Sequence, residues 1–408
     1  MSAYAALQSR DFRFFLTART CITVAIQIQM VVVGWQVYQI TKDPLSLGLI
    51  GLAEAIPAIS VALYAGHMAD ITERKKIILL CASLLVMCSV ALVYFSLETS
   101  TFIPRFGVLP IYSVIFVTGF ARGFLQPANF SFMPQLIPRE HYTNAITWYS
   151  TLWEGSSVVG PAMGGFFIKL YGIQTTYIVD ACLMACGLLA YALVRRKPLP
   201  PITGEQGMIE KIKAGLKFVF HNQIVLSAIS LDLFAVLFGG AVALLPVFAS
   251  DILKAGSEGF GLLRAAPAIG AVAMAVYLTY NPIKKHLGKI LLWCVAGFGL
   301  CMIGFGLSTL FWLSFAFLVG SGLCDSVSVI VRGMLIHTLT PENMKGRVAA
   351  VNSIFVGSSN EIGAFESGVV AKLMGVVNSV VFGGIMTLLV VGVTAKKADQ
   401  LVRLDKVE

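Results

Sequence analysis

The sequence predicts an all-α membrane protein in which twelve transmembrane helices form two pseudo-symmetric six-helix bundles. Of its 408 residues, 57% are hydrophobic and only 12% are charged, whereas a soluble domain carries about 25% charged residues. Apolar runs recur along the whole chain, and several reach the roughly 20 residues that cross a hydrocarbon core. The second half of the chain also repeats an ordered set of residues from the first half.

The apolar runs place the helices in order along the chain. The first run contains Arg13 and Arg19 and is followed by no small-residue cleavage site, so we expect a retained helix and not a signal peptide. The expected helices cover residues 12–40, 45–67, 76–97, 107–134, 143–169, 173–194, 219–250, 256–281, 287–307, 309–337, 347–372 and 376–395.

The distribution of basic residues predicts the orientation. When both termini are placed in the cytoplasm, most of the 30 Lys and Arg residues fall in cytoplasmic segments and few fall in outer loops, in agreement with the positive-inside rule. We therefore expect a multi-pass protein of the bacterial inner membrane whose N- and C-termini are cytoplasmic. The net charge of +9 follows from this topology, so it indicates no nucleic-acid partner.

An internal repeat divides the chain into two parallel halves. Offsets of 203 and 213 residues align them, and the aligned pairs include Gly165 with Gly368, Lys169 with Lys372, and Gly48 with Gly261. Two such halves are a transporter architecture, in which the substrate site lies between the halves near the bilayer midplane.

The repeat also sets the expected domain limits. We expect bundles at residues 1–194 and 219–395, a cytoplasmic linker at 195–218 and a cytoplasmic tail at 396–408. The linker contains an amphipathic run from Ile209 to Phe220, whose lysines would meet anionic lipid headgroups.

The segment between the second and third helices carries the first family motif. Gly66 permits a tight turn, Asp70 can cap the next helix, and Arg74 begins a basic cluster. This segment resembles the loop motif of the major facilitator superfamily, although Ile71 and Glu73 depart from the pattern. The resemblance implies that Gly66, Asp70 and Arg74 act in gating and do not bind substrate.

A second motif lies in the fifth helix. Pro161 frees a backbone carbonyl and bends the helix, while Gly160, Gly164 and Gly165 allow a neighbouring helix to approach closely. The segment resembles the antiporter motif of the same superfamily, with Ser156 in place of the first glycine. In that superfamily the motif accompanies efflux, and ordinary close packing is the alternative interpretation.

Further segments carry a narrower resemblance that covers nearly the whole chain. They are Trp35 to Thr41, Leu244 to Ala249, Thr340 to Val348, Asn352 to Phe355 and Ser359 to Gly368. The chain resembles the branch that contains the bacterial enterobactin exporter and, more distantly, macrolide efflux proteins. This resemblance implies a siderophore or an amphipathic, drug-like substrate.

Ionisable residues within the predicted helices are functional candidates, because each costs about 2.5 to 3.5 kcal/mol at the centre of a helix on insertion scales. The repeat aligns Arg122 with Asp325 and Arg19 with Asp232, in both cases with opposite charge. By family resemblance their helices line the central cavity. The candidate set for substrate binding and proton coupling is Arg122, Asp325, Asp232, Arg19, Gln126, Arg332, Glu154 and Glu361.

Two interpretations of these charges stay open. In the functional one, Asp232 and Asp325 take up and release protons, and Arg122 pairs with an acid or meets an anionic group of the substrate. In the structural one, ion pairs hold the two halves of the chain together. Glu54, Glu154, Glu361 and Glu366 also fall within helices, but we favour the two aspartates and Arg122.

Other classes of protein are disfavoured by missing motifs. The sequence has no phosphate-binding G-x-x-x-x-G-K-[ST] loop for an ATP-driven pump, and no catalytic or metal-binding pattern. Its eight cysteines lie in apolar runs without ligand spacing. We therefore expect no enzyme activity, no cofactor and no bound metal.

The sequence predicts a monomeric secondary transporter that exports a small molecule in exchange for protons by alternating access. The rival interpretations are siderophore-related or other uptake by the same fold, macrolide-type multidrug efflux, and a sensor that does not transport.

Overall fold

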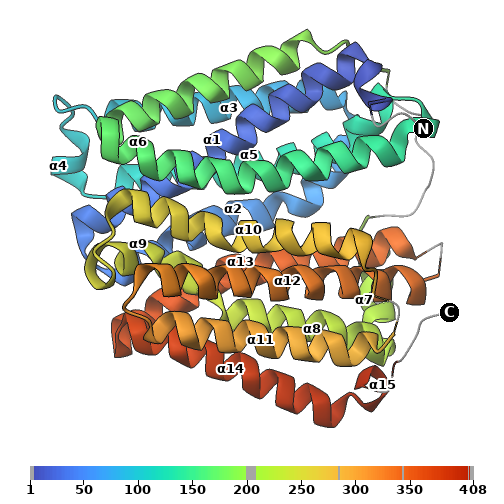
Figure 1. Cartoon of the computed structure of the whole chain (residues 1–408). Coiled ribbons are helices and arrows are strands. Elements are labelled where there is room, and N and C mark those ends of the chain that lie inside the picture. The colour runs from blue at the N-terminus through green and yellow to red at the C-terminus, as the bar shows by residue number, and fades with distance from the viewer. Residues whose placement is uncertain (1–3, 199–207, 284, 342–343, 403, 405–408) are drawn as a thin grey trace. The chain divides into compact units, whose positions relative to one another are not determined.

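The computed structural model describes residues 4–198, 208–283, 285–341, 344–402 and 404. Within these residues the chain consists of helices joined by turns and loops and contains no strand (Figure 1). The predicted all-α membrane architecture is therefore confirmed. The side chains of Asp70 and Lys211 lie outside the described residues, so the gating role of Asp70 and the lipid contact of Lys211 stay predictions. The N-cap residue of α3 is Glu73, so the expected cap by Asp70 was wrong.

The first half of the chain folds into long helices joined by short turns. These elements are η1 (Ala6–Gln8), α1 (Arg10–Thr41), α2 (Pro44–Ile71), α3 (Arg74–Phe95), α4 (Phe102–Phe106), α5 (Leu109–Phe132), η2 (Met133–Leu136), η3 (Arg139–His141) and α6 (Tyr142–Leu193). Gly172, with a φ of 81°, breaks α6 into two arms, which correspond to the fifth and sixth predicted helices. The short helix α4 was not predicted; Gly107, with a φ of 61°, separates it from α5.

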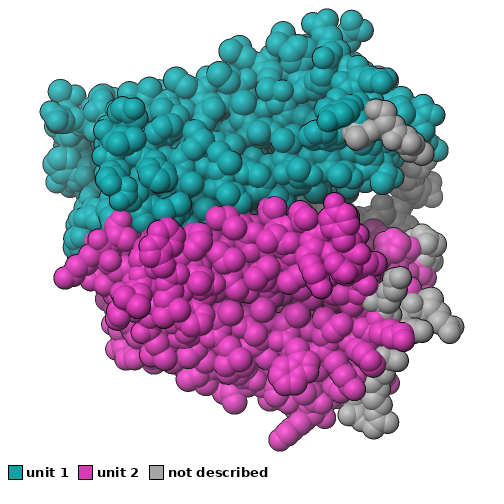
Figure 2. Space-filling model, in the orientation of Figure 1, with its two compact units in different colours: residues 1–42, 53–204, 256–265 teal, residues 43–52, 205–255, 266–408 magenta. Residues whose placement is uncertain are grey.

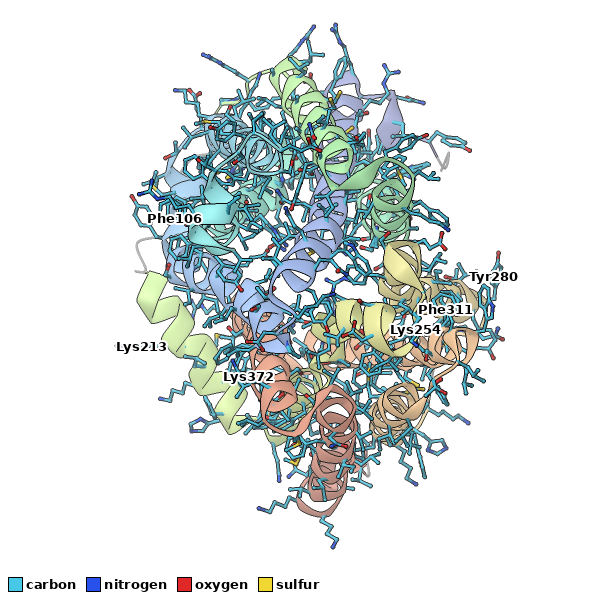
Figure 3. All side chains as sticks on the ribbon, turned by 90° about the vertical axis from the view of Figure 1, so that its left-hand side faces the viewer. Phe106, Lys213, Lys254, Tyr280, Phe311 and Lys372 are labelled. Carbon is cyan, nitrogen blue, oxygen red and sulfur yellow. The ribbon has the colours of Figure 1, made fainter. Side chains whose placement is uncertain are left out.

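The second half begins with the amphipathic helix α7 (Met208–His221), on which Lys213 (Figure 3) and Lys217 are exposed. The remaining elements are α8 (Gln223–Phe238), η4 (Gly240–Leu244), α9 (Leu245–Val247), η5 (Phe248–Ile252), α10 (Gly256–Tyr280), α11 (Leu287–Leu307), α12 (Phe311–Leu339), α13 (Lys345–Met374), α14 (Val376–Lys397) and α15 (Asp399–Val402).

The seventh predicted helix, at residues 219–250, corresponds to one membrane-long helical span at Gln223–Ile252, within which the type of helix changes. The chain leaves α-helical geometry at Gly239 and continues through η4, α9 and the π-helical turn η5. Gly240 packs directly against the Gly363 carbonyl of α13, an approach that a side chain would prevent. Pro246 also removes a backbone donor close to the break.

Ten helices of the described residues are long and apolar enough to cross a membrane. One of them spans both arms of α6, and α13 falls outside this set although it has 30 residues. Large apolar side chains such as Leu80, Met87 and Trp293 are exposed on the outside of their helices, as expected where lipid is the solvent. The number twelve itself stays a prediction.

The chain divides into two compact units that do not follow the sequence halves (Figure 2). Unit 1 comprises residues 1–42, 53–204 and 256–265, and unit 2 comprises residues 43–52, 205–255 and 266–408. In unit 1, α1 packs on α6, and α3 packs on α5 and α6. In unit 2, α11 packs on α12 and α14, and α8 packs on α13. The first turns of α2 and α10 thus each pack with helices of the other sequence half.

Candidate functional site

A buried ion pair joins α8 to α12 in unit 2. The Asp232 carboxylate contacts the Arg332 guanidinium, and each residue is only 5% exposed. Asp325 lies two helical turns before Arg332 on α12, on the face that the spacing predicts. The charged groups that sequence reasoning selected in the seventh and tenth helices are therefore brought together within one unit.

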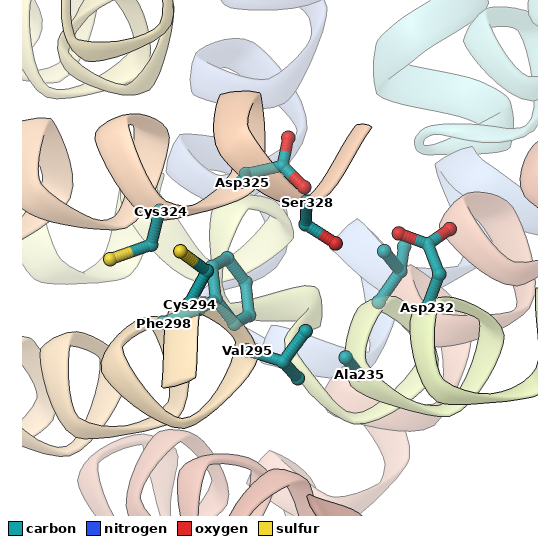
Figure 4. A pocket seen from close by; sticks show the side chains of 9 residues that line it. Asp232, Ala235, Cys294, Val295, Phe298, Cys324, Asp325 and Ser328 are labelled. Atoms are coloured by element: carbon teal, nitrogen blue, oxygen red, sulfur yellow. The ribbon is translucent and has the colours of Figure 1, made fainter. Parts of the chain in front are cut away.

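A small cavity lies beside this pair (Figure 4). Asp232, Asp325, Ser328, Cys294 and Cys324 are among the residues that line it. Its volume of about 10 Å³ is close to the space that one water molecule needs. The cavity is therefore too small for a substrate, and a proton-coupling role for Asp232 and Asp325 stays a prediction. Loss of the negative charge on Asp232 would leave Arg332 as an uncompensated buried charge.

A second ion pair occurs in unit 1, between Arg122 of α5 and Glu54 of α2. Glu54 is 8% exposed. Gly119, one turn before Arg122, packs against the Glu54 backbone so closely that a Cβ would collide with it. Sequence reasoning placed Glu54 behind the aspartates, because periodicity alone does not show which helix an acid faces. Gln126, one turn beyond Arg122, is exposed.

Arg19, the repeat equivalent of Asp232, has aromatic partners. Its guanidinium lies 3.2 Å from the centroid of the Tyr149 ring and donates a hydrogen bond of 2.9 Å to the Tyr149 carbonyl oxygen. A cation over an aromatic face is stabilised by the ring quadrupole. The arginine thereby ties α1 to the first arm of α6. Glu154, five residues after Tyr149 on that arm, is half-buried.

The two remaining acids occupy separate places in unit 2. Glu361 of α13 lies against Gly51 of α2, where its Oε2 would be 3.3 Å from an added Cβ. Glu366, further along α13, is also half-buried. A proton-coupling role for Glu361 or Glu154 stays a prediction.

The glycines of the fifth-helix motif all sit at helix contacts within unit 1. A Cβ on Gly160 would lie 2.5 Å from the Gln27 Cβ of α1, and one on Gly164 would lie 3.2 Å from the Val31 Cβ. Gln27 also donates a hydrogen bond of 3.2 Å to Ser157. These contacts give the motif a close-packing role, and its association with efflux stays a prediction.

The predicted gating segment, from Gly66 to Arg74, is hydrogen-bonded to α5. Arg74 donates hydrogen bonds to the Ala69 carbonyl oxygen at 3.0 Å and to the Ser131 carbonyl oxygen at 2.9 Å. The α2–α3 turn is therefore tied to the end of α5, and the gating role of Gly66, Asp70 and Arg74 stays a prediction. Gly66 is half-buried within α2, which continues to Ile71, so the expected tight turn at this glycine was wrong.

Two seams of small residues follow the sequence repeat. In unit 1, Gly165 of α6 faces Gly261 of α10, where a Cβ on Gly165 would lie 2.8 Å from the Gly261 Cα. In unit 2, Gly368 of α13 faces Gly48 of α2, where a Cβ on Gly368 would lie 3.0 Å from the Gly48 Cα. The repeat partners found in the sequence thus make equivalent contacts, one seam in each unit.

An ion pair extends each seam. Lys169 Nζ lies 2.5 Å from Glu258 Oε2 in unit 1, and Lys372 Nζ (Figure 3) lies 2.9 Å from Asp43 Oδ2 in unit 2. The repeat identified both lysines, but it gave no sign of their acidic partners, because Asp43 and Glu258 are not aligned with each other.

Asp43 also accepts a hydrogen bond of 3.1 Å from the Leu45 backbone N–H at the start of α2. Burial alone would raise the pKa of Asp43. The hydrogen bonds from Lys372 and Leu45 and the positive charge of Lys372 outweigh burial and hold this pKa below its ordinary value.

Comparisons with known proteins agree on one class. The sequence pattern of a major facilitator family described as a transmembrane secretion effector matches residues 1–407. An enterobactin exporter of Shigella boydii is 25% identical over 382 residues, which are 94% of this chain and 90% of that protein. The enterobactin exporter of Salmonella choleraesuis is 25% identical over 388 residues, 93% of this chain and 92% of that protein.

Solved transporters share the fold at lower identity. A D-xylose–proton symporter superposes with a TM-score of 0.71 at 12% identity, over 96% of this chain and 98% of that one. A POT family transporter in complex with 5-aminolevulinic acid superposes with a TM-score of 0.74 at 13% identity, over 96% of this chain and 97% of that one. The fold expected from the loop and antiporter motifs is confirmed.

Proposed function

Because the chain belongs to the transmembrane secretion effector family of major facilitator transporters, we propose that it is a secondary exporter of a siderophore, driven by the inward flow of protons. The observation that carries the proposal is the match to enterobactin exporters over 94% of the chain. A multi-pass transporter of this family needs no catalytic centre, so the chain is proposed to act without enzyme activity.

The buried ion pairs support proton coupling. Asp232 and Arg332 lie inside unit 2 beside a cavity that can hold about one water. A proton that reaches Asp232 or Asp325 through this water would weaken the pair and change the packing of α8 on α12. Arg122 with Glu54 is the corresponding charged pair of unit 1.

Alternating access is proposed to occur by movement of the predicted bundles at residues 1–194 and 219–395. The seams at Gly165 with Gly261 and at Gly48 with Gly368 support this mechanism, because side-chain-free surfaces let helices slide and separate with little interlocking. In this proposal the protein is a monomer of the inner membrane with both termini in the cytoplasm, and lysines of α7 contact lipid headgroups.

The test uses inside-out membrane vesicles, in which export appears as accumulation. An imposed pH gradient, acid inside, should drive uptake of iron-free enterobactin by the wild-type protein. Asp232→Asn and Asp325→Asn should reduce this accumulation, whereas Glu98→Gln should not, because Glu98 is exposed in the α3–α4 loop.

The alternative functions are distinguishable in the same assay. Accumulation of a macrolide in place of enterobactin would move the substrate class to multidrug efflux. Gradient-driven accumulation only in right-side-out vesicles would indicate uptake. If neither aspartate variant alters accumulation, the proposed coupling residues are wrong.

A further inference from the structure

An aspartate that the sequence did not single out lies in the interior of unit 1. Asp180, in the second arm of α6, has no exposed surface. Two other buried acids within helices have arginine partners: Glu54 pairs with Arg122, and Asp232 pairs with Arg332. Among the described residues, no basic side chain pairs with Asp180.

The surroundings of Asp180 are polar but neutral. The Ser89 hydroxyl of α3 lies close to the carboxyl. Within the described part of the chain, the two carboxyl oxygens of Asp180 make no hydrogen bond of normal geometry. The same holds for the hydroxyl oxygen of Ser89. Buried polar atoms without partners are rare in native structures, so each one calls for a physical explanation, such as a functional role or a bound ion or water.

Among the residues that the structure describes, no charged side chain interacts with Asp180. On α6 itself, Tyr177 lies one turn before Asp180 and interacts with it, and the exposed Cys182 lies two residues beyond. On α3, Cys88 precedes Ser89, and α5 contributes the neutral Thr118 to the same interior. The charged Arg122 of α5 is held by Glu54.

Asp180 is connected to α1 through its neighbour. The Tyr177 hydroxyl donates a hydrogen bond of 2.7 Å to Gln36 Oε1 of α1, and both residues are buried. A change in the packing around Asp180 would therefore alter the contact between α1 and α6, which is the most extensive helix contact of unit 1.

Complete burial without a cation favours the neutral form of Asp180. An ionised carboxylate at a helix centre costs about 2.5 to 3.5 kcal/mol on insertion scales, and here no cation offsets that cost. A neutral carboxyl avoids it, and its O–H can donate a hydrogen bond to Ser89. A bound proton supplies the missing donor without needing space, whereas a metal ion would need a cavity.

We propose that Asp180 is a proton-binding site of the transport cycle, which holds an occluded proton in the packed state of unit 1. Asp180 lies about 12 Å along α6 from the break at Gly172, at 1.5 Å per residue. In the proposed orientation, the Gly172 end of this arm faces the outside of the cell. In an exporter driven by protons, that is the side from which the proton enters. The inference rests on the proposed proton coupling.

Infrared spectroscopy tests the bound proton without transport. Purified wild-type protein with isotopically labelled aspartate should show a protonated aspartate carboxyl band at neutral pH that does not exchange readily with deuterium. Asp180→Asn should lose this band, and the matched control Glu98→Gln should keep it. Absence of the band from the wild type, or its retention in Asp180→Asn, would overturn the assignment whatever the protein transports.

Transport then tests the role of the proton. Asp180→Asn mimics the protonated form, so it should still equilibrate substrate down its own gradient but lose stimulation by a pH gradient. Asp180→Glu keeps a carboxyl, so it should retain stimulation with a shifted pH midpoint even if Asp180→Asn folds poorly. Stimulation unchanged in Asp180→Asn, or driven by a sodium gradient in place of protons, would contradict the proposal. If the wild type shows no gradient-driven transport, the proposed function fails while the infrared result still stands.

Discussion

Removing the charge of Asp232 should destabilise the protein far more than removing the charge of Glu258, although each acid forms one ion pair. In the Asp232–Arg332 pair both side chains are 6% exposed, so water does not screen the charges. Breaking such a pair from one side costs about 3 to 5 kcal/mol, because the remaining charge stays buried without compensation. In the Lys169–Glu258 pair the side chains are 54% and 33% exposed, and such pairs contribute about 0.2 to 1 kcal/mol.

The assay is the free energy of unfolding in mixed detergent micelles, measured for Asp232→Asn, Arg332→Gln, the double variant and Glu258→Gln. Asp232→Asn should lose several times more stability than Glu258→Gln. The double variant should be more stable than the sum of its single effects predicts, because neither charge is then left alone. Equal losses for Asp232→Asn and Glu258→Gln would refute the reasoning that burial sets the strength of the pair.

Gly165→Leu should block transport without preventing membrane insertion, because the seam has no room for a side chain. The control Gly155→Leu, on the same helix, faces open space and should transport normally. Equal flux in the two variants would contradict the packing argument. The lowered pKa of Asp43 means that its contribution to stability is complete above its unfolded-state pKa and is lost as the pH falls through its folded-state value. Lys372→Met should therefore flatten the acid side of the profile of thermal unfolding against pH, and a profile like that of the wild type would show that the pair is not responsible. Arg74→Gln should loosen the α2–α3 turn and increase protease cleavage there in limited digestion, because two carbonyl contacts are lost; unchanged cleavage would count against a fastening role.

Hydropathy and the internal repeat predicted much of the fold. The apolar runs located most long helices because burial in lipid requires them. The repeat aligned Lys169 with Lys372, and in the structure each lysine forms an ion pair at the end of a glycine seam. The break at Gly239 was missed because the surrounding residues remain apolar, so hydropathy does not change where the backbone does.

The partners of the buried charges were less accessible to sequence reasoning. Spacing placed Asp325 and Arg332 on one face of α12, yet Arg332 pairs with Asp232, because the rotation of each helix decides which side chains meet. Glu54 was ranked low for the same reason. Asp180 was passed over because nothing near it in the sequence marks a site, and only its complete burial without a cation distinguishes it.

The most direct test of the account is the direction of proton movement during transport. Purified protein is reconstituted in liposomes that contain a pH-sensitive dye, and an enterobactin gradient is imposed without a pH gradient. We expect protons to move opposite to the siderophore, with the signal abolished by Asp232→Asn but not by Glu98→Gln. Protons that move with the siderophore, or siderophore flux without any proton signal, would contradict proton-driven export.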